Sequence, residues 1–527
     1  MNQKNNATNH QTSGFWLFII IVLVLGVWFR FVNLDRKVYW HDEAFTSLRI
    51  SGYTTTEVHQ QLFNGQVIGI SDLQKYQILN TEKSLVDAVT SLAIDDAQHP
   101  PLYYILVRLW VRLFGNSIAA IRSLSVLISL LVFPCIYWLC RELFESPLVG
   151  WIAMALIAVS PFHVAYAQEA REYSLWTVTI LLSSTALLRA LRINRLSSWS
   201  IYTLTLSLSL YTFPLSIFVG IGHSVYVIAR ERFKLTKTTK AYLLASLMGL
   251  LSFAPWLGIA IATWSRTGAT WTATPMPSLI WLKMWGMHIN RAFILSIELF
   301  GFDNPLTYLI LLFFLIIIGY SIYFICHQTA PKTWLFVLTF MVTLALALAL
   351  PDLIFGGQRS ISSRYLVPMY LGIQLSVAYL LAKSFSTRKF WQLVMVVLIS
   401  AGVFSCTVSS QAETSWNKVV SYYNHKIAAI VNQTKAPLLI SNSFGMNFGN
   451  ILALSHILEP KVRFILVDGS TQHDFLNIPQ IPPDFSDVFV LNPSEKFLQK
   501  IKREYNTELE LVFQDHHLWL WELKRLE

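Results

Sequence analysis

Long apolar runs, joined by short polar connections, make up most of this chain. The first run, residues 14–31, is long enough to cross about 30 Å of hydrocarbon as a helix. The chain has 527 residues, of which 54% are hydrophobic and 13% charged, and a soluble protein of this length is not so apolar. We predict an all-α polytopic membrane domain with about eleven spans, at residues 14–31, 118–140, 147–167, 173–191, 198–212, 214–229, 241–264, 306–326, 333–350, 364–382 and 390–408.

The basic residues predict the orientation of these spans. Three arginines lie in the connection 189–195, and several more basic residues lie in 230–238. The positive-inside rule places both connections, and the polar tail 1–13, in the cytoplasm. The net charge of +10 then reflects membrane topology and not binding to nucleic acid. Residues 99–117 carry two arginines four positions apart, so we expect an interfacial helix there and not a span.

The domain organisation follows from a change of pattern near residue 411. We predict a membrane domain over 14–410 with a large outer loop over 33–117, followed by a soluble, extracytoplasmic α/β domain over 411–527. In that last domain, apolar β-rich segments alternate with amphipathic ones. The expected strands are 436–441, 462–468, 487–492 and 508–514, and the expected helices are 450–458 and 494–505.

Charged residues lie beside the predicted outer ends of three spans. They are Asp42 with Glu43, Glu169 with Arg171, and the arginines of 359–364. A carboxylate can accept the proton of an attacking hydroxyl, and cations can hold a phosphate leaving group. This combination predicts a group-transfer site at the outer face of the membrane.

Four motifs resemble one family when taken in order. They are "VYWHDEAFT" (38–46), "HPPLYYILVRLWVRLFGNS" (99–117), "SPFHVAYAQEAREYSLW" (160–176) and "SSRYLVPMY" (362–370). The chain is similar to the membrane glycosyltransferases of family 39, relatives of the protein O-mannosyltransferases and of the lipid A aminoarabinose transferase, and most of all to a bacterial branch. The resemblance covers about residues 15–380 and implies the GT-C fold.

The resemblance also implies roles for the acidic motifs. Asp42 matches the catalytic base, and Glu43 is its usual neighbour; alternatively, the two acids cap an interfacial helix. Glu169 would orient the acceptor or the sugar, with Arg171 paired to it and Gln168 contacting substrate. The alternative for this second motif is an ion pair at a helix end.

The basic motifs would bind the donor phosphate. His99 matches a residue that faces the lipid phosphate, or it is an exposed residue before a helix that the following prolines begin. Arg364, with Tyr365 as a substrate contact, suits bidentate phosphate binding, although it could instead extend to lipid headgroups. Arg359 could serve in its place.

The expected reaction transfers a sugar from a polyprenyl-phosphate donor to a hydroxyl of a glycan, lipid or protein acceptor, with inversion. We expect a bacterial plasma membrane, with membrane lipids as neighbours and no required cofactor, although the two acidic motifs could hold a divalent cation. Two alternatives are a lipid or sugar transporter or flippase, which usually has paired broken helices, and a non-catalytic envelope assembly protein.

Overall fold

The chain folds into two compact units, each with a core of its own. The computed structural model describes residues 2–267, 270–385, 388–469, 480–505 and 507–524. Unit 1 comprises Met1–Val32, Ala97–Tyr103 and Arg122–Gln411, and unit 2 comprises Asn33–Asp96, Tyr104–Ile121 and Ala412–Glu527.

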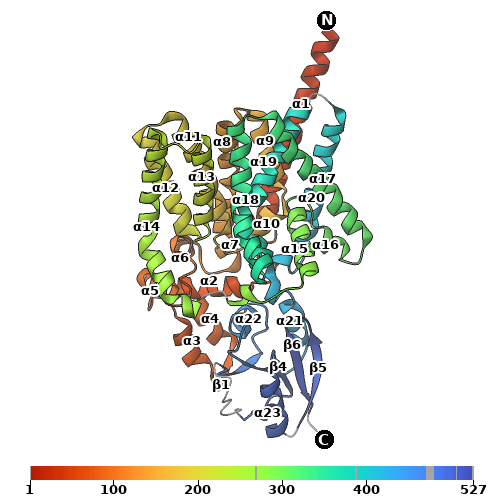
Figure 1. Ribbon diagram of the computed structural model, residues 1–527. Helices are drawn as coiled ribbons and strands as arrows, with labels where there is room; N and C mark the ends of the chain where they lie inside the picture. The colour runs from red at the N-terminus through yellow and green to blue at the C-terminus, as the bar shows by residue number, and fades with distance from the viewer. Residues whose placement is uncertain (1, 268–269, 386–387, 470–479, 506, 525–527) are drawn as a thin grey trace. The chain divides into compact units, whose positions relative to one another are not determined.

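Unit 1 is a bundle whose long helices lie side by side (Figure 1). Short 3-10 turns, η2 (Thr270–Ala273), η3 (Arg359–Ile361) and η4 (Ser363–Leu366), interrupt its connections. Its helices are α1 (Asn2–Phe31), α7 (Ile118–Leu130), α8 (Val132–Phe144), α9 (Pro147–Ala158), α10 (Pro161–Ala167), α11 (Tyr173–Ile193), α12 (Leu196–Thr212), α13 (Ser216–Arg230), α14 (Lys237–Thr267), α15 (Ser278–Arg291), α16 (Ser296–Phe300), α17 (Pro305–Gln328), α18 (Pro331–Phe355), α19 (Val367–Ser384) and α20 (Lys389–Gln411).

Helices are present at all eleven predicted spans, but not all are long enough to cross a membrane. Among the described residues, eight helical segments are long and apolar enough, or nine if the bent pair α9 and α10 counts as one span. The other two predicted spans correspond to α12 and α13, which have 17 and 15 residues. Because α12 and α13 are short, the structure contains eight or nine candidate spans in its described residues, where we predicted about eleven.

The distribution of apolar residues explains how the helices pack. Leu309, Leu312 and Ile316 recur along α17 at helical spacing and are exposed, as expected of side chains that face lipid. In α19, every residue except Lys383 is buried, because the helix is apolar on all sides. Pro368 stands in the first turn of α19, where a missing N–H costs nothing.

A break between α9 and α10 creates the turn that bears the second acidic motif. The two helices are bent by 64°. Pro161 begins α10, and proline cannot continue the preceding helix because it lacks the N–H donor. Helix α10 ends at Ala167 and α11 begins at Tyr173, so residues 168–172 form a short link between two helices of one bundle.

Unit 2 contains a six-stranded mixed sheet of order β1-β3-β2-β4-β6-β5. The parallel pairs are β2–β3 and β2–β4, and the other pairs are antiparallel. The strands are β1 (Asn64–Gly69), β2 (Pro437–Asn442), β3 (Arg463–Val467), β4 (Asp487–Leu491), β5 (Glu508–Gln514) and β6 (Trp519–Lys524). The helices and 3-10 turns are α2 (His41–Ser51), α3 (Thr55–Leu62), α4 (Ile70–Gln74), η1 (Lys75–Gln77), α5 (Leu85–Asp95), η5 (Trp416–Ser421), α21 (Asn424–Asn432), α22 (Asn447–Leu454) and α23 (Glu495–Tyr505), while α6 (Leu102–Phe114) lies largely in this unit.

The predicted C-terminal strands and helices are present, with one addition from a distant part of the chain. Strand β1 lies in the segment that we predicted as an outer loop of the membrane domain, and it pairs antiparallel with β3. The structure thus groups Asn33–Asp96 with the C-terminal sheet in one unit.

Alternate residues of the parallel strands form the sheet core. Leu438 and Ile440 of β2 lie in one buried cluster with Phe497 and Ile501 of α23. The two α23 residues are four apart and so share one helical face. The rest of α23 is strongly charged, as expected of a helix that covers a sheet and faces water.

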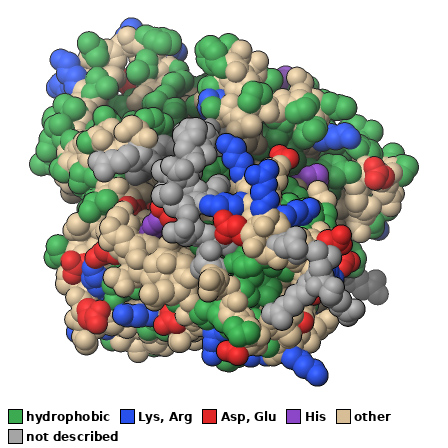
Figure 2. Space-filling view, turned by 90° about the horizontal axis from the view of Figure 1, so that it is seen from below, with side chains coloured by type: hydrophobic (Ala, Val, Ile, Leu, Met, Phe, Trp, Pro, Cys, Tyr) green, Lys and Arg blue, Asp and Glu red, His purple; other side chains and the backbone are tan. Residues whose placement is uncertain are grey.

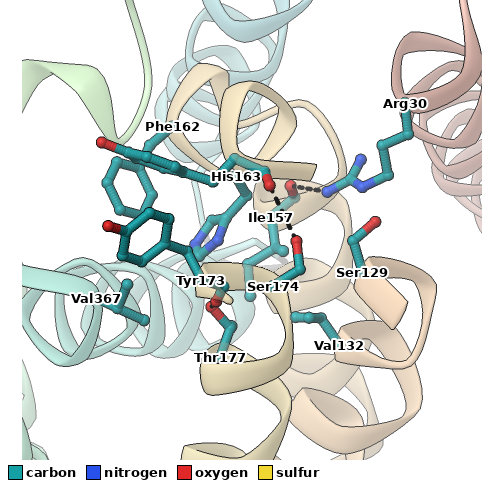
Figure 3. A pocket seen from close by; sticks show the side chains of 11 residues that line it. Arg30, Ser129, Val132, Ile157, Phe162, His163, Tyr173, Ser174, Thr177 and Val367 are labelled. Atoms are coloured by element: carbon teal, nitrogen blue, oxygen red, sulfur yellow. Dashed lines mark hydrogen bonds between the residues drawn. The ribbon is translucent and has the colours of Figure 1, made fainter. Parts of the chain in front are cut away.

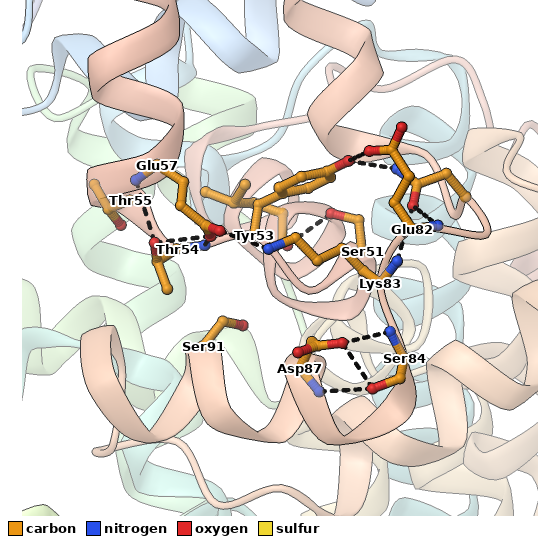
Figure 4. Close-up of polar contacts among 12 residues, drawn as sticks. Ser51, Tyr53, Thr54, Thr55, Glu57, Glu82, Lys83, Ser84, Asp87 and Ser91 are labelled. Atoms are coloured by element: carbon orange, nitrogen blue, oxygen red, sulfur yellow. Dashed lines mark hydrogen bonds and ion pairs between the residues drawn. The ribbon is translucent and has the colours of Figure 1, made fainter.

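A polar network fastens the segment between α2 and α5 of unit 2 (Figure 4). The side chains of Thr54 and Ser84 begin α3 and α5 as capping boxes. Lys83 Nζ lies 2.5 Å from Glu57 Oε1 and so links the two caps. In addition, the buried Arg49 pairs with Asp95 and Asp96, at 2.8 and 2.6 Å.

Charges of both signs are mixed on the molecular face shown in Figure 2, with hydrophobic side chains among them. In α23, the adjacent residues Arg503 and Glu504 are both exposed. Such mixing is typical of a water-facing surface.

Candidate functional site

A buried group of charged side chains lies at the helix ends of unit 1. His99 Nδ1 lies 2.8 Å from Glu172 Oε1, and Arg171 Nη2 lies 3.1 Å from His99 Nε2. Arg171 Nε is 3.4 Å from Glu172 Oε2. We call His99, Arg171 and Glu172 the ion cluster. Its members come from the short stretch before α6 and from the link between α10 and α11.

The ion cluster is almost closed to water. The side chains of Glu172, Arg171 and His99 are 0%, 4% and 16% exposed. Burial opposes ionisation of Glu172, but the positive charge of Arg171 and the contact with His99 outweigh it and lower the carboxyl pKa to about 2. Glu172 is therefore ionised at neutral pH. Its negative charge balances the positive charge of the adjacent Arg171.

The lowered pKa of Glu172 predicts a specific dependence of stability on pH. A carboxyl group whose pKa is depressed by folding stabilises the protein above its unfolded pKa, and this stabilisation is lost as pH falls toward the folded pKa. We expect the apparent Tm of Glu172→Gln to lie below that of the wild type at pH 7, and the gap to narrow between about pH 4.5 and 2. Thermal unfolding of both purified proteins across this range tests the prediction, and a gap that stays constant would contradict it.

Aromatic rings surround the ion cluster and connect it with the Arg364 motif. The Phe213 ring lies 6.4 Å from the His99 ring and 5.8 Å from the Tyr365 ring, close to parallel with each. The guanidinium of Arg364 lies 5.4 Å from the centre of the Tyr365 ring. Arg364, Arg171 and Glu172 all interact electrostatically with the hydroxyl of Tyr173. The structure thus brings His99, Arg171, Arg364 and Tyr365 into one neighbourhood of unit 1.

The link 168–172 is itself tied to two other parts of the bundle. Gln168 Nε2 donates to the carbonyls of Phe29 and Val32, at 2.9 and 2.8 Å. Tyr166 lies 3.3 Å from Ser363, which precedes Arg364. Through these bonds the Gln168 amide anchors the link to α1 and the residue that follows it. Glu169 is fully buried, and its charge interacts with Tyr166.

Arg359 is bound within its own loop. Its Nη1 donates to Asp352 Oδ1 at 3.1 Å and to the Gly356 carbonyl at 3.0 Å. The other Asp352 oxygen accepts from the backbone and hydroxyl of Ser360. These bonds show that Arg359 stabilises its own loop through Asp352 and Gly356.

A small cavity of about 10 Å³ lies inside unit 1, with room for one water molecule (Figure 3). His163, Tyr173 and Arg30 are among its lining residues. Arg30 donates to the Ile157 and Ala158 carbonyls at the end of α9. The cavity is too small for a sugar.

Asp42 and Glu43 lie in unit 2, in the first turn of α2, and their environments differ. Glu43 is fully buried, and its Oε2 lies 2.9 Å from Lys418 Nζ and 3.4 Å from the Trp40 N–H. Glu43 therefore takes the capping role that was the alternative for this motif. Asp42 is 19% exposed, with its Oδ1 3.3 Å from His41 Nδ1. Of the pair, Asp42 is the one whose carboxylate is partly open to solvent.

Two members of this neighbourhood lie outside the main predicted site residues. Glu172 was a less certain participant in the second acidic motif, and its position next to Arg171 at the start of α11 was the signal. Phe213, which follows α12, gave no signal in the sequence. Across the described residues, no group of three or more His, Cys, Asp or Glu side chains could hold a metal ion.

Part of the chain matches a protein-family model. Residues 98–259 match the model of the dolichyl-phosphate-mannose-protein mannosyltransferase family. The matched segment includes His99, Gln168, Glu169, Arg171 and Glu172. No curated protein sequence matches the chain.

Several solved structures are similar. ArnT from Cupriavidus metallidurans bound to undecaprenyl phosphate has a TM-score of 0.53 and 11% identity, with 97% of this chain and 98% of that chain covered. ArnT in the apo state has a TM-score of 0.42 and 12% identity, with the same coverage. The archaeal oligosaccharyltransferase AglB from Archaeoglobus fulgidus, in complex with an inhibitory peptide and a dolichol-phosphate, has a TM-score of 0.46 and 12% identity, with 84% and 64% covered.

At 11% identity, the likeness to undecaprenyl-phosphate-bound ArnT shows a shared fold. Together with the family match it confirms the predicted resemblance: the chain has the GT-C fold of the mannosyltransferase and ArnT type, in a multi-pass membrane protein.

Proposed function

We propose that this chain, a membrane glycosyltransferase with the GT-C fold, transfers a sugar from a polyprenyl-phosphate donor to an acceptor hydroxyl, with inversion of the anomeric carbon. The observation that carries the proposal is the buried ion cluster, which lies within the segment matched by the mannosyltransferase family. The structural relative ArnT was solved with undecaprenyl phosphate, a lipid of the proposed donor class.

In the proposed reaction, the acceptor oxygen forms a bond to the anomeric carbon while the bond from that carbon to the phosphate oxygen breaks. The acceptor proton passes to the Asp42 carboxylate, and polyprenyl phosphate leaves with one more negative charge than it had in the donor. Arg364, with a planar fork of N–H donors, and the cations of the ion cluster stabilise that charge. A single displacement inverts the anomeric centre.

The proposed location is a bacterial plasma membrane, with the N-terminus in the cytoplasm and the C-terminal domain outside. A donor embedded in the bilayer explains why buried charges lie beside apolar helix ends in unit 1. The acceptor is a glycan, a lipid or a protein, and the proposal does not depend on which.

Incubation of the purified protein with a panel of radiolabelled polyprenyl-phosphate sugars tests the proposal. We expect release or transfer of sugar from one donor and free polyprenyl phosphate as the second product. A transporter or flippase would instead move the intact donor across proteoliposomes without cleaving it, and an assembly protein would do neither. Either result contradicts the proposal. A product with retained configuration at the anomeric carbon would contradict the inverting step.

A further inference from the structure

We propose that the C-terminal segment of unit 2 positions the catalytic carboxylate: the stretch around η5 and the helix α22 hold the first turn of α2, and so fix the direction of Asp42. This inference rests on the proposed role of Asp42 as the base. It assigns a task to a soluble region whose fold contains no catalytic motif recognisable in the sequence.

The first contact is a buried ion pair. Lys418 of η5 lies 2.9 Å from Glu43, and the two side chains are 2% and 0% exposed. The ammonium of Lys418 also lies 5.6 Å from the centre of the Trp40 ring, over its face. Trp40 immediately precedes α2. One residue of the C-terminal segment therefore holds the chain on both sides of His41 and Asp42.

The second contact is made by the backbone. The His41 N–H donates to Ser421 Oγ at 3.0 Å, and Ser421 Oγ donates in turn to Asn450 Oδ1 of α22 at 2.6 Å. Three residues before His41, the Val38 N–H donates to the Glu413 carbonyl at 2.8 Å. An N–H at the beginning of a helix has no partner within that helix, so these bonds fix where α2 starts.

The third contact is close packing of a ring on a glycine. A Cβ atom added to Gly449 of α22 would overlap His41 Cδ2 and lie 2.6 Å from His41 Nε2. Only glycine leaves room for the His41 ring in this place. The same ring reaches Asp42 with Nδ1, at 3.3 Å from Oδ1. One helical turn later, Phe45 stacks on Phe448, the neighbour of Gly449.

These contacts together fix the two residues that flank Asp42. His41 is held through its N–H and its ring by Ser421 and Gly449, and Glu43 is held through its carboxylate by Lys418, so that all three partners come from the C-terminal segment. A catalytic base acts only if its position is accurate, and a displacement of about 1 Å can cost about 100-fold in rate. The first turn of α2 obtains that accuracy from the C-terminal segment.

The substitution Gly449→Ala tests this inference, with Tm measured beside kcat: alanine favours a helix, but the added methyl group overpacks the contact with the His41 ring and disturbs the contact of that ring with Asp42. The new methyl group must displace the His41 ring. We expect kcat to fall about 10- to 100-fold with the donor selected in the panel above, while KM for that donor is unchanged. The matched control is Gly319→Ala on α17, where an added Cβ meets nothing within 4 Å, and its kcat should equal that of the wild type.

A double-mutant cycle with His41→Ala separates positioning from general damage. Without the ring there is nothing for the new methyl group to displace, so Gly449→Ala should cause no further loss of kcat in a His41→Ala background. The inference is overturned if Gly449→Ala keeps the wild-type kcat, or if it lowers kcat equally with and without the ring. Asp42→Asn in the same assay tests the premise: full activity of that variant refutes the proposed base itself and not its positioning.

Discussion

Replacing Asp42, the proposed base, by Asn is expected to lower the rate of sugar transfer by about 10²- to 10⁴-fold, the usual contribution of a general base. The amide has nearly the same shape as the carboxylate but cannot accept the acceptor proton. Asp42 is partly exposed, whereas Glu43 is buried in an ion pair with Lys418. Glu43 could take over the role of Asp42 only if that buried ion pair were broken. Single-turnover measurement of sugar transfer from the donor identified in the panel gives the rate directly.

Two controls make this result specific. Asp484→Asn removes the same charge from an exposed position of unit 2 and should leave the rate unchanged. Binding of polyprenyl phosphate should be the same for Asp42→Asn and the wild type, because the base is not assigned to the phosphate. An Asp42→Asn protein that inserts, binds this lipid and transfers sugar at the wild-type rate would rule out Asp42 as the base.

Much of the fold could be predicted because its signals are local. Each of the four predicted C-terminal strands is a short apolar or alternating run, and each lies within a residue or two of its predicted range. Strand β1, "NGQVIG", has no such signal, since glycine and asparagine are poor strand formers. It is a strand because it pairs with β3, almost 400 residues later, and a pairing so distant cannot be inferred from local pattern.

The sequence indicated which residues belong to the candidate site, but not which of them contact one another. Motif order selected Asp42, His99, Arg171 and Arg364, all of which are ionisable residues beside helix ends. Which groups touch depends on side-chain directions in three dimensions, and so the contact of His99 with Glu172 and the burial of Glu43 against Lys418 came only from the structure. Likewise, Arg359 and Arg364 are alike in sequence, and only the Asp352 contact separates their roles.

The second prediction with a large expected effect is that loss of Arg171 lowers both the stability and the activity of the protein. Replacing Arg171 by Met leaves the fully buried Glu172 without its adjacent guanidinium, and breaking a buried pair in this way costs about 3–5 kcal/mol. We therefore expect a large drop in the apparent Tm of Arg171→Met. Removing both charges, in Arg171→Met with Glu172→Gln, should restore most of the lost stability, because an apolar or neutral replacement leaves no buried unpaired charge.

Activity distinguishes a structural ion cluster from a functional one. If Arg171 stabilises the charge of the departing phosphate, the double variant recovers its Tm but still transfers sugar slowly and binds polyprenyl phosphate weakly. A double variant that is both stable and fully active would show that the cluster only supports the fold. Arg192→Met is the comparison: Arg192 pairs with Glu142 at 2.9 Å, and the arginine is 62% exposed although the glutamate is 8% exposed, so its loss should cost less than the loss of Arg171 and leave transfer unchanged. Both variants remove the arginine of an arginine–glutamate pair, and the arginine is 4% exposed in the ion cluster against 62% here, so the difference expected in stability follows from burial of the guanidinium.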